Sequence, residues 1–159
     1  MPFGRSTPVS AGVLADRRGL CVCAAATYNL SVGSPLVTGS VTRCTFGLAP
    51  SVLNVLPVNR VLGSNLPVAN IMDSKPIVNI VPFGMCNSIA NPTVASATAA
   101  ALGVLTPMPC IPVTGTPWIS ASRVLLANMP IATTDSKCMC SWGGVITVTS
   151  SPAVTIQAK

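Results

Sequence analysis

The chain has 159 residues, enough for one domain, with a formal net charge of +6 and only 8% charged residues. Half of the residues are hydrophobic but only 4% are aromatic, so we expect a core of Val, Leu, Ile and Ala. The chain has no His and no Glu, and its only side-chain carboxylates are Asp16, Asp73 and Asp135. General acid–base catalysis normally uses His or a carboxylate pair, so we expect no enzymatic activity and no catalytic residue.

The small number of charges also bears on partners. Ordinary soluble domains have roughly 25% charged residues, so we expect a partner to cover much of this surface. The cations are scattered and are not interleaved with aromatic side chains, which argues against nucleic-acid binding. Residues 1–35 are rich in Ser, Thr, Gly, Pro and Ala, and we assign them to a partly flexible N-terminal extension without a signal peptide. Residues 36–159 are expected to form the folded domain.

From Leu36 onward the sequence predicts short strands bounded by Gly, Pro, Asn or Asp. Leu36–Cys44 is expected to be a strand with a bulge or turn at Gly39 and Ser40. The last residues, Ala153–Gln157, are expected to continue a sheet. The fold class is therefore mainly β. The remaining predicted strands are Val52–Leu56, Arg60–Leu62, Val68–Ile71, Ile77–Val81, Trp118–Ser120, Val124–Ala127 and Gly144–Thr149.

One short helix is predicted within Pro82–Pro112, and we expect the rest of the chain to be organised around this stretch. Asn91 is suited to cap the helix, Pro92 to stand in its first turn, and Gly103 to end it in a left-handed conformation. The residues between them are nearly all Ala, Val, Thr and Ser. We therefore expect the helix to pack closely against the structure beneath it.

Two segments of the chain repeat each other. Residues 61–75 and 124–137 share Val, Leu, Asn, Pro, Ala, Asp, Ser and Lys once one residue is deleted. A recurring strand–turn–strand unit predicts a pseudo-symmetric β structure. Residues 44–47 suggest a third, degraded copy, because they share a Cys–x–aromatic–Gly pattern with residues 140–143. Chance similarity between turn-rich segments is the alternative.

The seven cysteines are the main chemical feature of the sequence. An odd number leaves one unpaired in a secreted protein, whereas in a reducing compartment it indicates metal binding or buried thiols. In an extended strand Cys138 and Cys140 would point to the same face, where both thiolates could meet one ion. A thiolate site for zinc or iron is one interpretation, and inert thiols or disulfides are the other. Cys21 and Cys23 rank below the five candidates Cys44, Cys86, Cys110, Cys138 and Cys140.

Several motifs resemble the cysteine-rich PAAR-like tip proteins of bacterial contractile injection systems, which include extracellular phage-tail-like particles and some type VI secretion systems. The resemblance covers about residues 36–150 in the same order, whereas the tail before Leu36 departs from the family pattern. The motifs that carry it are Asn54–Arg60, Ala69–Asp73, Pro82–Cys86, Asn91–Ala100, Leu105–Pro112 and Ser136–Gly144.

The resemblance implies a small cone of β-hairpins with pseudo-threefold symmetry and one short helix. Its base would sit on the end of a trimeric β-helical spike, one tip per trimer, and its point would lead when the particle pierces a target envelope. A metal ion near the apex is typical of the family, and without His it would be held by thiolates. The resemblance carries this role to Cys44, Cys86, Cys138 and Cys140, with Cys110 as the fifth candidate; the ion would be zinc, or alternatively iron.

The same resemblance implies a structural, membrane-puncturing protein that is assembled in the bacterial cytoplasm and then stands at the particle tip, outside the cell or delivered on firing. Its partners would be the spike, an effector cargo and, transiently, the target membrane. A small cysteine-rich metal-binding or redox protein is the alternative function, and it rests on Cys138 and Cys140 alone. A third interpretation, a secreted effector, is disfavoured because the N-terminal arm is too short and simple for an enzyme domain.

Overall fold

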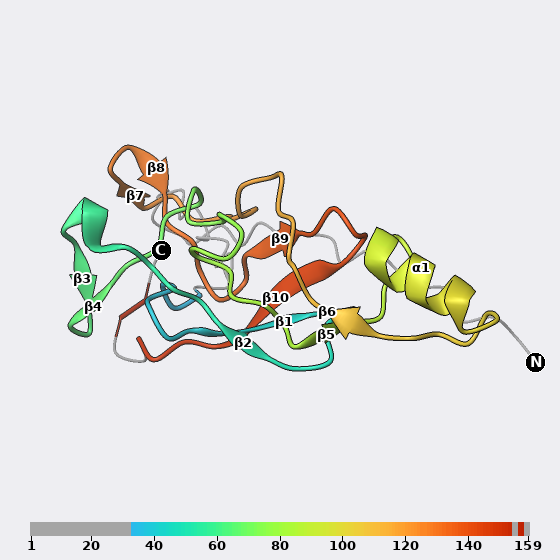
Figure 1. Cartoon of the computed structure of the whole chain (residues 1–159). Coiled ribbons are helices and arrows are strands. Elements are labelled where there is room, and N and C mark those ends of the chain that lie inside the picture. Colours follow the sequence, from blue (N-terminus) through green and yellow to red (C-terminus); the bar gives the residue numbers. More distant parts are fainter. Residues whose placement is uncertain (1–32, 154–155, 158–159) are drawn as a thin grey trace, which may run out of the picture.

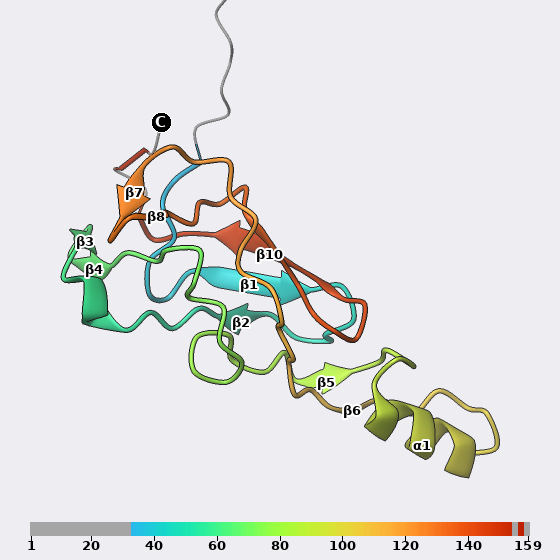
Figure 2. The same ribbon diagram turned by 90° about the horizontal axis from the view of Figure 1, so that it is seen from above.

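The computed structural model of the chain describes residues 33–153, 156 and 157 (Figure 1). Most of the predicted N-terminal extension, with Cys21 and Cys23, lies outside the described residues. The described body is elongated, with two β-hairpins at one end and the helix α1 at the other (Figures 1 and 2). This part of the chain is mainly β, with small hairpin sheets and one short α-helix, as the sequence predicts.

A four-stranded antiparallel sheet forms the middle of the body. Its order is β2 (Ser51–Val52), β1 (Val41–Cys44), β10 (Val145–Ser150) and β9 (Lys137–Met139). The long strand β10 is rich in β-branched residues, which favour extended backbone. Its Ile146 is fully buried and lies opposite Cys44 on one side and Cys138 on the other. The register therefore directs two cysteine-bearing strands toward one core.

Three two-stranded antiparallel sheets accompany this sheet. Each pairs two strands that are consecutive in the chain. They are β3 (Leu62–Gly63) with β4 (Leu66–Pro67), β5 (Met85–Cys86) with β6 (Met108–Pro109), and β7 (Leu125–Leu126) with β8 (Met129–Pro130). The first and last pairs are the two copies of the sequence repeat. Their turns have the same backbone, since φ is 51° and 65° both at Ser64 and Asn65 and at Ala127 and Asn128. Left-handed values at both central residues are typical of tight hairpin turns.

The core has two parts. The smaller lies at the hairpin end and contains Val37, Val68, Leu126, Ile131 and Ala153. The larger is built around Phe83 and Trp118 with aliphatic side chains such as Ile146, and it includes all five described cysteines. A core with so few aromatic residues agrees with the composition of the chain.

The helix α1 (Pro92–Ala100) has the predicted ends but not the predicted role. Asn91 caps it by accepting a hydrogen bond from the N–H of Thr93, and Gly103 is left-handed at φ 90°. Val94 is its only buried residue, so the expectation that the chain is organised around a closely packed helix is wrong. Small side chains bury little apolar surface and therefore contribute little to a core.

Several predicted strands are shorter than expected or are not strands. Residues 77–81 form a turn, in which the N–H groups of Asn79 and Ile80 both donate to the carbonyl of Lys75. Ile77 is left-handed at φ 66°, which is incompatible with a strand. Arg60 ends a short 3-10 helix, η1 (Pro57–Asn59), instead of starting a strand. The described residues 153, 156 and 157 lie outside any strand, and residues 68–71 and 118–120 contribute only isolated bridges.

Candidate functional site

Three segments of the chain meet at the hairpin end in a closed ring of hydrogen bonds. The N–H of Leu36 donates to the carbonyl of Ala132, that of Ala132 to Ala69, and that of Ala69 back to Leu36. The N···O distances are 2.8, 3.1 and 2.8 Å, and all three residues are fully buried. Each segment thus donates to one neighbour and accepts from the other. This cyclic order is a pseudo-threefold arrangement of one chain.

A second set of hydrogen bonds joins the same three segments, and its donors run around the ring in the opposite direction. In each segment, the N–H of the residue two positions after the ring residue is the donor. It donates to the carbonyl of the residue two positions before the ring residue that follows in chain order, with the third segment returning to the first. These bonds join Thr38 to Pro67 (3.1 Å), Ile71 to Pro130 (3.0 Å) and Thr134 to Ser34 (2.9 Å). The threefold relation therefore extends over at least five residues of each segment.

Each segment then leaves the ring through the same turn. In each turn a backbone N–H donates to the side-chain oxygen of the residue three positions later. The donor and acceptor pairs are Val37 and Ser40, Asn70 and Asp73, and Thr133 and Ser136. Burial raises the pKa of the Asp73 carboxyl, and the hydrogen bond from Asn70 lowers it in part. These turns place Asp73 at the position of Ser136, whereas the sequence alignment paired it with Asp135. The deleted residue therefore falls after the turn.

The ring also locates the third copy of the repeat. Ser40 and Ser136 occupy equivalent turns, and Cys44 and Cys140 each lie four residues further along the chain. The N–H of Gly47 donates to the carbonyl of Cys44, and the N–H of Gly143 donates to that of Cys140. The shared Cys–x–aromatic–Gly pattern thus reflects equivalent turns. The copy itself begins earlier than the pattern suggested, in the segment around Leu36.

The two repeated hairpins present apolar side chains beside the ring. We call this surface the hairpin face. Leu62 and Leu125 occupy equivalent positions and are 56% and 59% exposed. Between the hairpins lies a groove of about 200 Å³, lined almost entirely by apolar residues. The exposed apolar residues that define the hairpin face are Val61, Leu62, Val124, Leu125, Met129 and Ile156.

In each copy of the repeat, an arginine directly precedes the first apolar residue of the hairpin face. Arg60 precedes Val61 in the first copy and Arg123 precedes Val124 in the second, and both arginines are exposed. This pair is not among the residues predicted from the sequence, although it follows from extending the repeat by one residue. The hairpin face therefore combines an apolar centre with basic groups at its edge, which is the usual composition of a protein interface.

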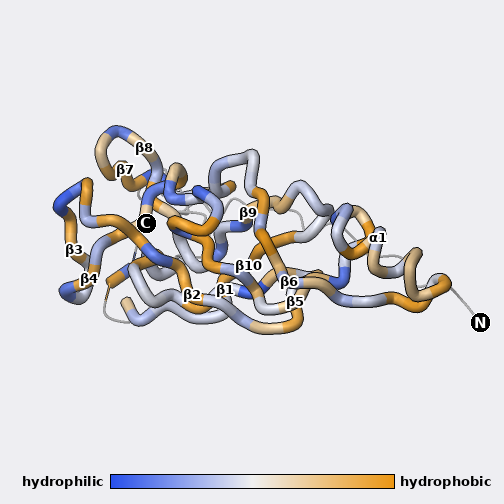
Figure 3. The backbone as a smooth tube through the Cα atoms, viewed as in Figure 1, coloured by the Kyte–Doolittle hydropathy of each residue, from blue (hydrophilic) through white to orange (hydrophobic). Residues whose placement is uncertain are grey.

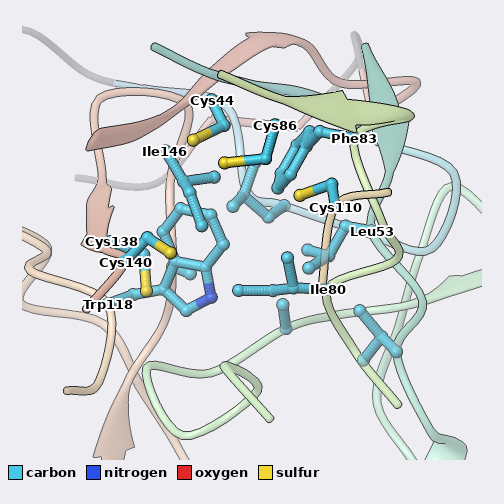
Figure 4. Close-up of a cluster of buried hydrophobic side chains, with 14 of the residues drawn as sticks. Cys44, Leu53, Ile80, Phe83, Cys86, Cys110, Trp118, Cys138, Cys140 and Ile146 are labelled. Carbon is cyan, nitrogen blue, oxygen red and sulfur yellow. The ribbon is translucent and has the colours of Figure 1, made fainter. Parts of the chain in front are cut away.

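All five candidate cysteines of the described chain are buried free thiols in the larger core (Figure 4). Cys138 and Cys140 are both buried while Met139 between them is exposed, which confirms that they point to the same face. The thiol of Cys138 points to the carbonyl oxygen of Thr116, at 3.6 Å. Gly144 makes room for Cys44, because a Cβ at this position would lie 2.7 Å from its sulfur.

The environment of three of these thiols, those of Cys44, Cys110 and Cys138, favours the neutral form. Burial raises the pKa of Cys44 and Cys110, and the neighbouring cysteines raise it further. Burial raises the pKa of Cys138 to about 11. Metal ligation and nucleophilic attack both require the thiolate. The surroundings of these three cysteines therefore suit apolar packing better than reactive chemistry.

The described residues do not fit the predicted metal site as they are placed. Within residues 33–153, 156 and 157, no group of three or more Cys, Asp or Glu side chains is arranged to hold an ion. The thiols of Cys44, Cys86, Cys110 and Cys140 are near enough to affect one another electrostatically, but they pack among apolar side chains. A zinc or iron site stays a prediction, and no later step depends on it.

A family model described as "Domain of unknown function (DUF4280)" matches residues 36–152, most of the chain. The chain belongs to the DUF4280 family. No curated protein and no solved structure matches it significantly. The matched residues of the DUF4280 domain contain the four-stranded sheet, all three two-stranded sheets and the five buried cysteines. The described helix of this domain is too short to cross a bilayer.

We expect the DUF4280 domain to lose stability as the pH rises from about 9 to about 11. Unfolded thiols ionise near their model value of 9.0, whereas the folded Cys138 thiol holds its proton to about 11. In this range the unfolded state binds fewer protons, so the free energy of unfolding falls with pH. Urea unfolding at a series of pH values under reducing conditions measures the fall, and Cys138→Ala should make it shallower. An unchanged free energy of unfolding would show that the thiols are not protonated core groups.

Chelation tests the predicted metal directly. Because the thiols pack as core side chains, we expect treatment with EDTA under reducing conditions to change the Tm by no more than a few degrees. This corresponds to a change of about 1 kcal/mol or less in the free energy of unfolding. Elemental analysis before and after treatment gives the metal content. Loss of one equivalent of zinc or iron together with a large fall in Tm would restore the thiolate site, since structural metal contributes directly to folding.

Proposed function

We propose that this DUF4280 domain is a PAAR-like tip that caps the trimeric spike of a bacterial contractile injection system. The observation that carries the proposal is the ring formed by Leu36, Ala69 and Ala132, with its cyclic hydrogen bonds. A single chain that contacts a trimer on its axis must offer similar groups in three directions. The buried ring arranges three segments of the chain about one axis, as this requires, whereas a monomer without internal symmetry would leave one or two spike chains poorly contacted.

The chemistry of the hairpin face supports docking at this end. Leu62 and Leu125 are more than half exposed on equivalent hairpins, in a chain with very few charges. Exposed apolar groups gathered on one surface usually mark an interface. Arg60 and Arg123 at its edge would pair with acidic or carbonyl groups on the spike. Repeated contacts of this kind suit a permanent cap.

In this role the domain is structural, and its work is mechanical. It would close the end of the spike and lead it through the target envelope when the sheath contracts. Assembly would take place in the bacterial cytoplasm, and the fired particle would carry the tip outside the cell or deliver it. Effector cargo is a further proposed partner. Phage-tail-like particles and type VI systems both fit the proposal, which involves no catalysis.

The alternative of a small metal or redox protein has less support. It needs accessible, reactive thiols, whereas Cys138 is fully buried and Cys140 is 7% exposed. The raised pKa of Cys138 further lowers its thiolate fraction at neutral pH. The pseudo-threefold ring and the hairpin face would also have no purpose in such a protein.

Co-expression with a candidate spike from the same gene cluster tests the proposal. A tagged spike trimer should retain the full chain through size-exclusion chromatography. A trimer of unrelated β-helical sequence serves as the control and should not retain it. If the chain elutes as a free monomer beside every spike candidate encoded near it, the proposed function is wrong.

A further inference from the structure

At the end of the described body opposite the hairpin face lies α1, which belongs to an uncharged stretch of the sequence. From Pro76 to Ser122 the sequence contains no Lys, Arg, Asp or Glu, and this stretch includes α1 and the turn after it. We call α1 together with residues 101–105 the uncharged lobe. It projects from the body in two perpendicular views, and the turn after α1 is coloured as apolar in Figure 3.

Large apolar side chains are displayed at the end of this lobe. Leu102 is 96% exposed, Val104 67% and Leu105 46%. The backbone of Leu102 is left-handed at φ 54°, a conformation that Gly or Asn adopts more readily than a bulky residue. The N–H of Leu102 helps to close the helix by donating to the carbonyl of Ala99, but its side chain is almost fully exposed and contributes little to the core. Its position therefore indicates an external contact.

Several polar groups of the lobe and its flanking residues form hydrogen bonds with one another. Thr93 donates its hydroxyl to the side-chain oxygen of Asn91, Ser96 to the carbonyl of Thr93, and Thr106 to the carbonyl of Val104. The turn after the helix is closed by N–H groups of residues 101–104, which donate to carbonyls within residues 97–101. A surface that enters hydrocarbon must satisfy its own backbone groups, because no water is present there.

We propose that the uncharged lobe inserts its end, with Leu102 and Val104, into the apolar layer of a lipid bilayer. A protein partner would more often meet charged or hydrogen-bonding groups at the rim of such a patch, and this lobe offers none with a charge. Nine helical residues span about 13 Å, far less than the roughly 30 Å hydrocarbon core of a bilayer. The lobe would therefore enter one leaflet without crossing it. The proposal extends the proposed function by giving the end opposite the docking face a lipid ligand.

Sedimentation of the full chain with phosphatidylcholine vesicles in high salt tests the insertion. These vesicles carry no net charge, so the basic residues of the chain give no electrostatic attraction. We expect the wild-type chain to bind, and Leu102→Gly to bind about tenfold less or weaker, because it removes one large apolar side chain. Val58→Asp is the matched control, since Val58 is 77% exposed near the hairpin face, and it should bind like wild type.

The Leu102→Gly variant also separates insertion from folding. Glycine accepts the left-handed backbone at this position, so the Tm of the variant should be no lower than that of wild type. Wild-type chain that stays in the supernatant, or Leu102→Gly that binds equally well, would overturn the proposal. So would a wild-type dimer in analytical ultracentrifugation that Leu102→Gly dissociates, because the lobe would then face a second copy.

The two proposals can fail separately. Leu102→Gly should still bind the spike trimer, because Leu102 directly follows α1, which lies at the opposite end of the body from the β3–β4 and β7–β8 hairpins (Figures 1 and 2). Vesicle binding without any spike binding would leave the lipid proposal standing and remove the tip function. Spike binding without vesicle binding would leave the tip function standing and remove the lipid proposal.

Discussion

Replacing Leu62 and Leu125 together by aspartate is expected to abolish binding of the domain to the proposed trimeric spike while the domain stays folded. Both side chains are more than half exposed at equivalent hairpin positions. Burying a leucine side chain in an interface contributes about 1.5–3 kcal/mol, so losing two should weaken binding by about a hundredfold or more. Two carboxylates forced into an apolar contact would weaken it further.

The double variant is measured against a matched change at the other end of the molecule. Surface substitutions usually alter stability by no more than about 0.5 kcal/mol, so the Tm of the double variant should stay close to that of wild type. Leu102→Asp serves as the control, because it places the same charge on an exposed leucine in the uncharged lobe. Surface plasmon resonance on an immobilised spike trimer compares the three proteins. Equal affinity of wild type and the double variant would show that the hairpin face is not the docking surface.

Gly47→Ala should produce the largest loss of stability among single small substitutions in the domain. A Cβ at this position would overlap the Cβ of the fully buried Phe83 and would lie 3.3 Å from the Cβ of Cys44. Neither neighbour can move aside easily, because both belong to the larger core. Overpacking of a core typically costs about 1–3 kcal/mol and occasionally more, and we expect the upper end of this range.

Gly115→Ala is the control for this effect. A Cβ at Gly115 would meet no atom within 4 Å, and its φ is not left-handed. The substitution should therefore be neutral or should stabilise by up to about 1 kcal/mol through the unfolded state. Urea unfolding of both variants gives the comparison. If Gly47→Ala is as stable as Gly115→Ala, the packing of Phe83 against the turn of residues 44–47 is not as described.

Local signals in the sequence predicted the elements whose geometry is decided locally. The Asn91 cap, the left-handed Gly103 and the alternation of Cys138, Met139 and Cys140 were all read correctly, because each depends on a few adjacent residues. The repeated hairpin was also predicted, since the turn residues at 64–65 and 127–128 occupy matching positions in the two copies.

Features that depend on contacts between distant segments were predicted less well. The ring joins Leu36, Ala69 and Ala132 through backbone groups, which leave no mark in side-chain identity. The pattern shared by residues 44–47 and 140–143 was the only trace of the third unit. The prediction that the helix packs closely was wrong, because strong end signals determine where a helix begins and ends but not how much surface it buries. The small side chains of this helix bury little. Whether the five cysteines bind an ion depends on thiol geometry, which spacing along the chain does not determine.

The central claim is that one copy of this domain caps three spike chains. Native mass spectrometry of the co-expressed, purified complex measures this ratio directly. We predict one DUF4280 chain per spike trimer, with no species carrying two or three, because the pseudo-threefold ring already presents the trimer with three similar segments. Three chains per trimer would contradict the account, since each spike chain would then bind its own copy and the internal symmetry would have no role.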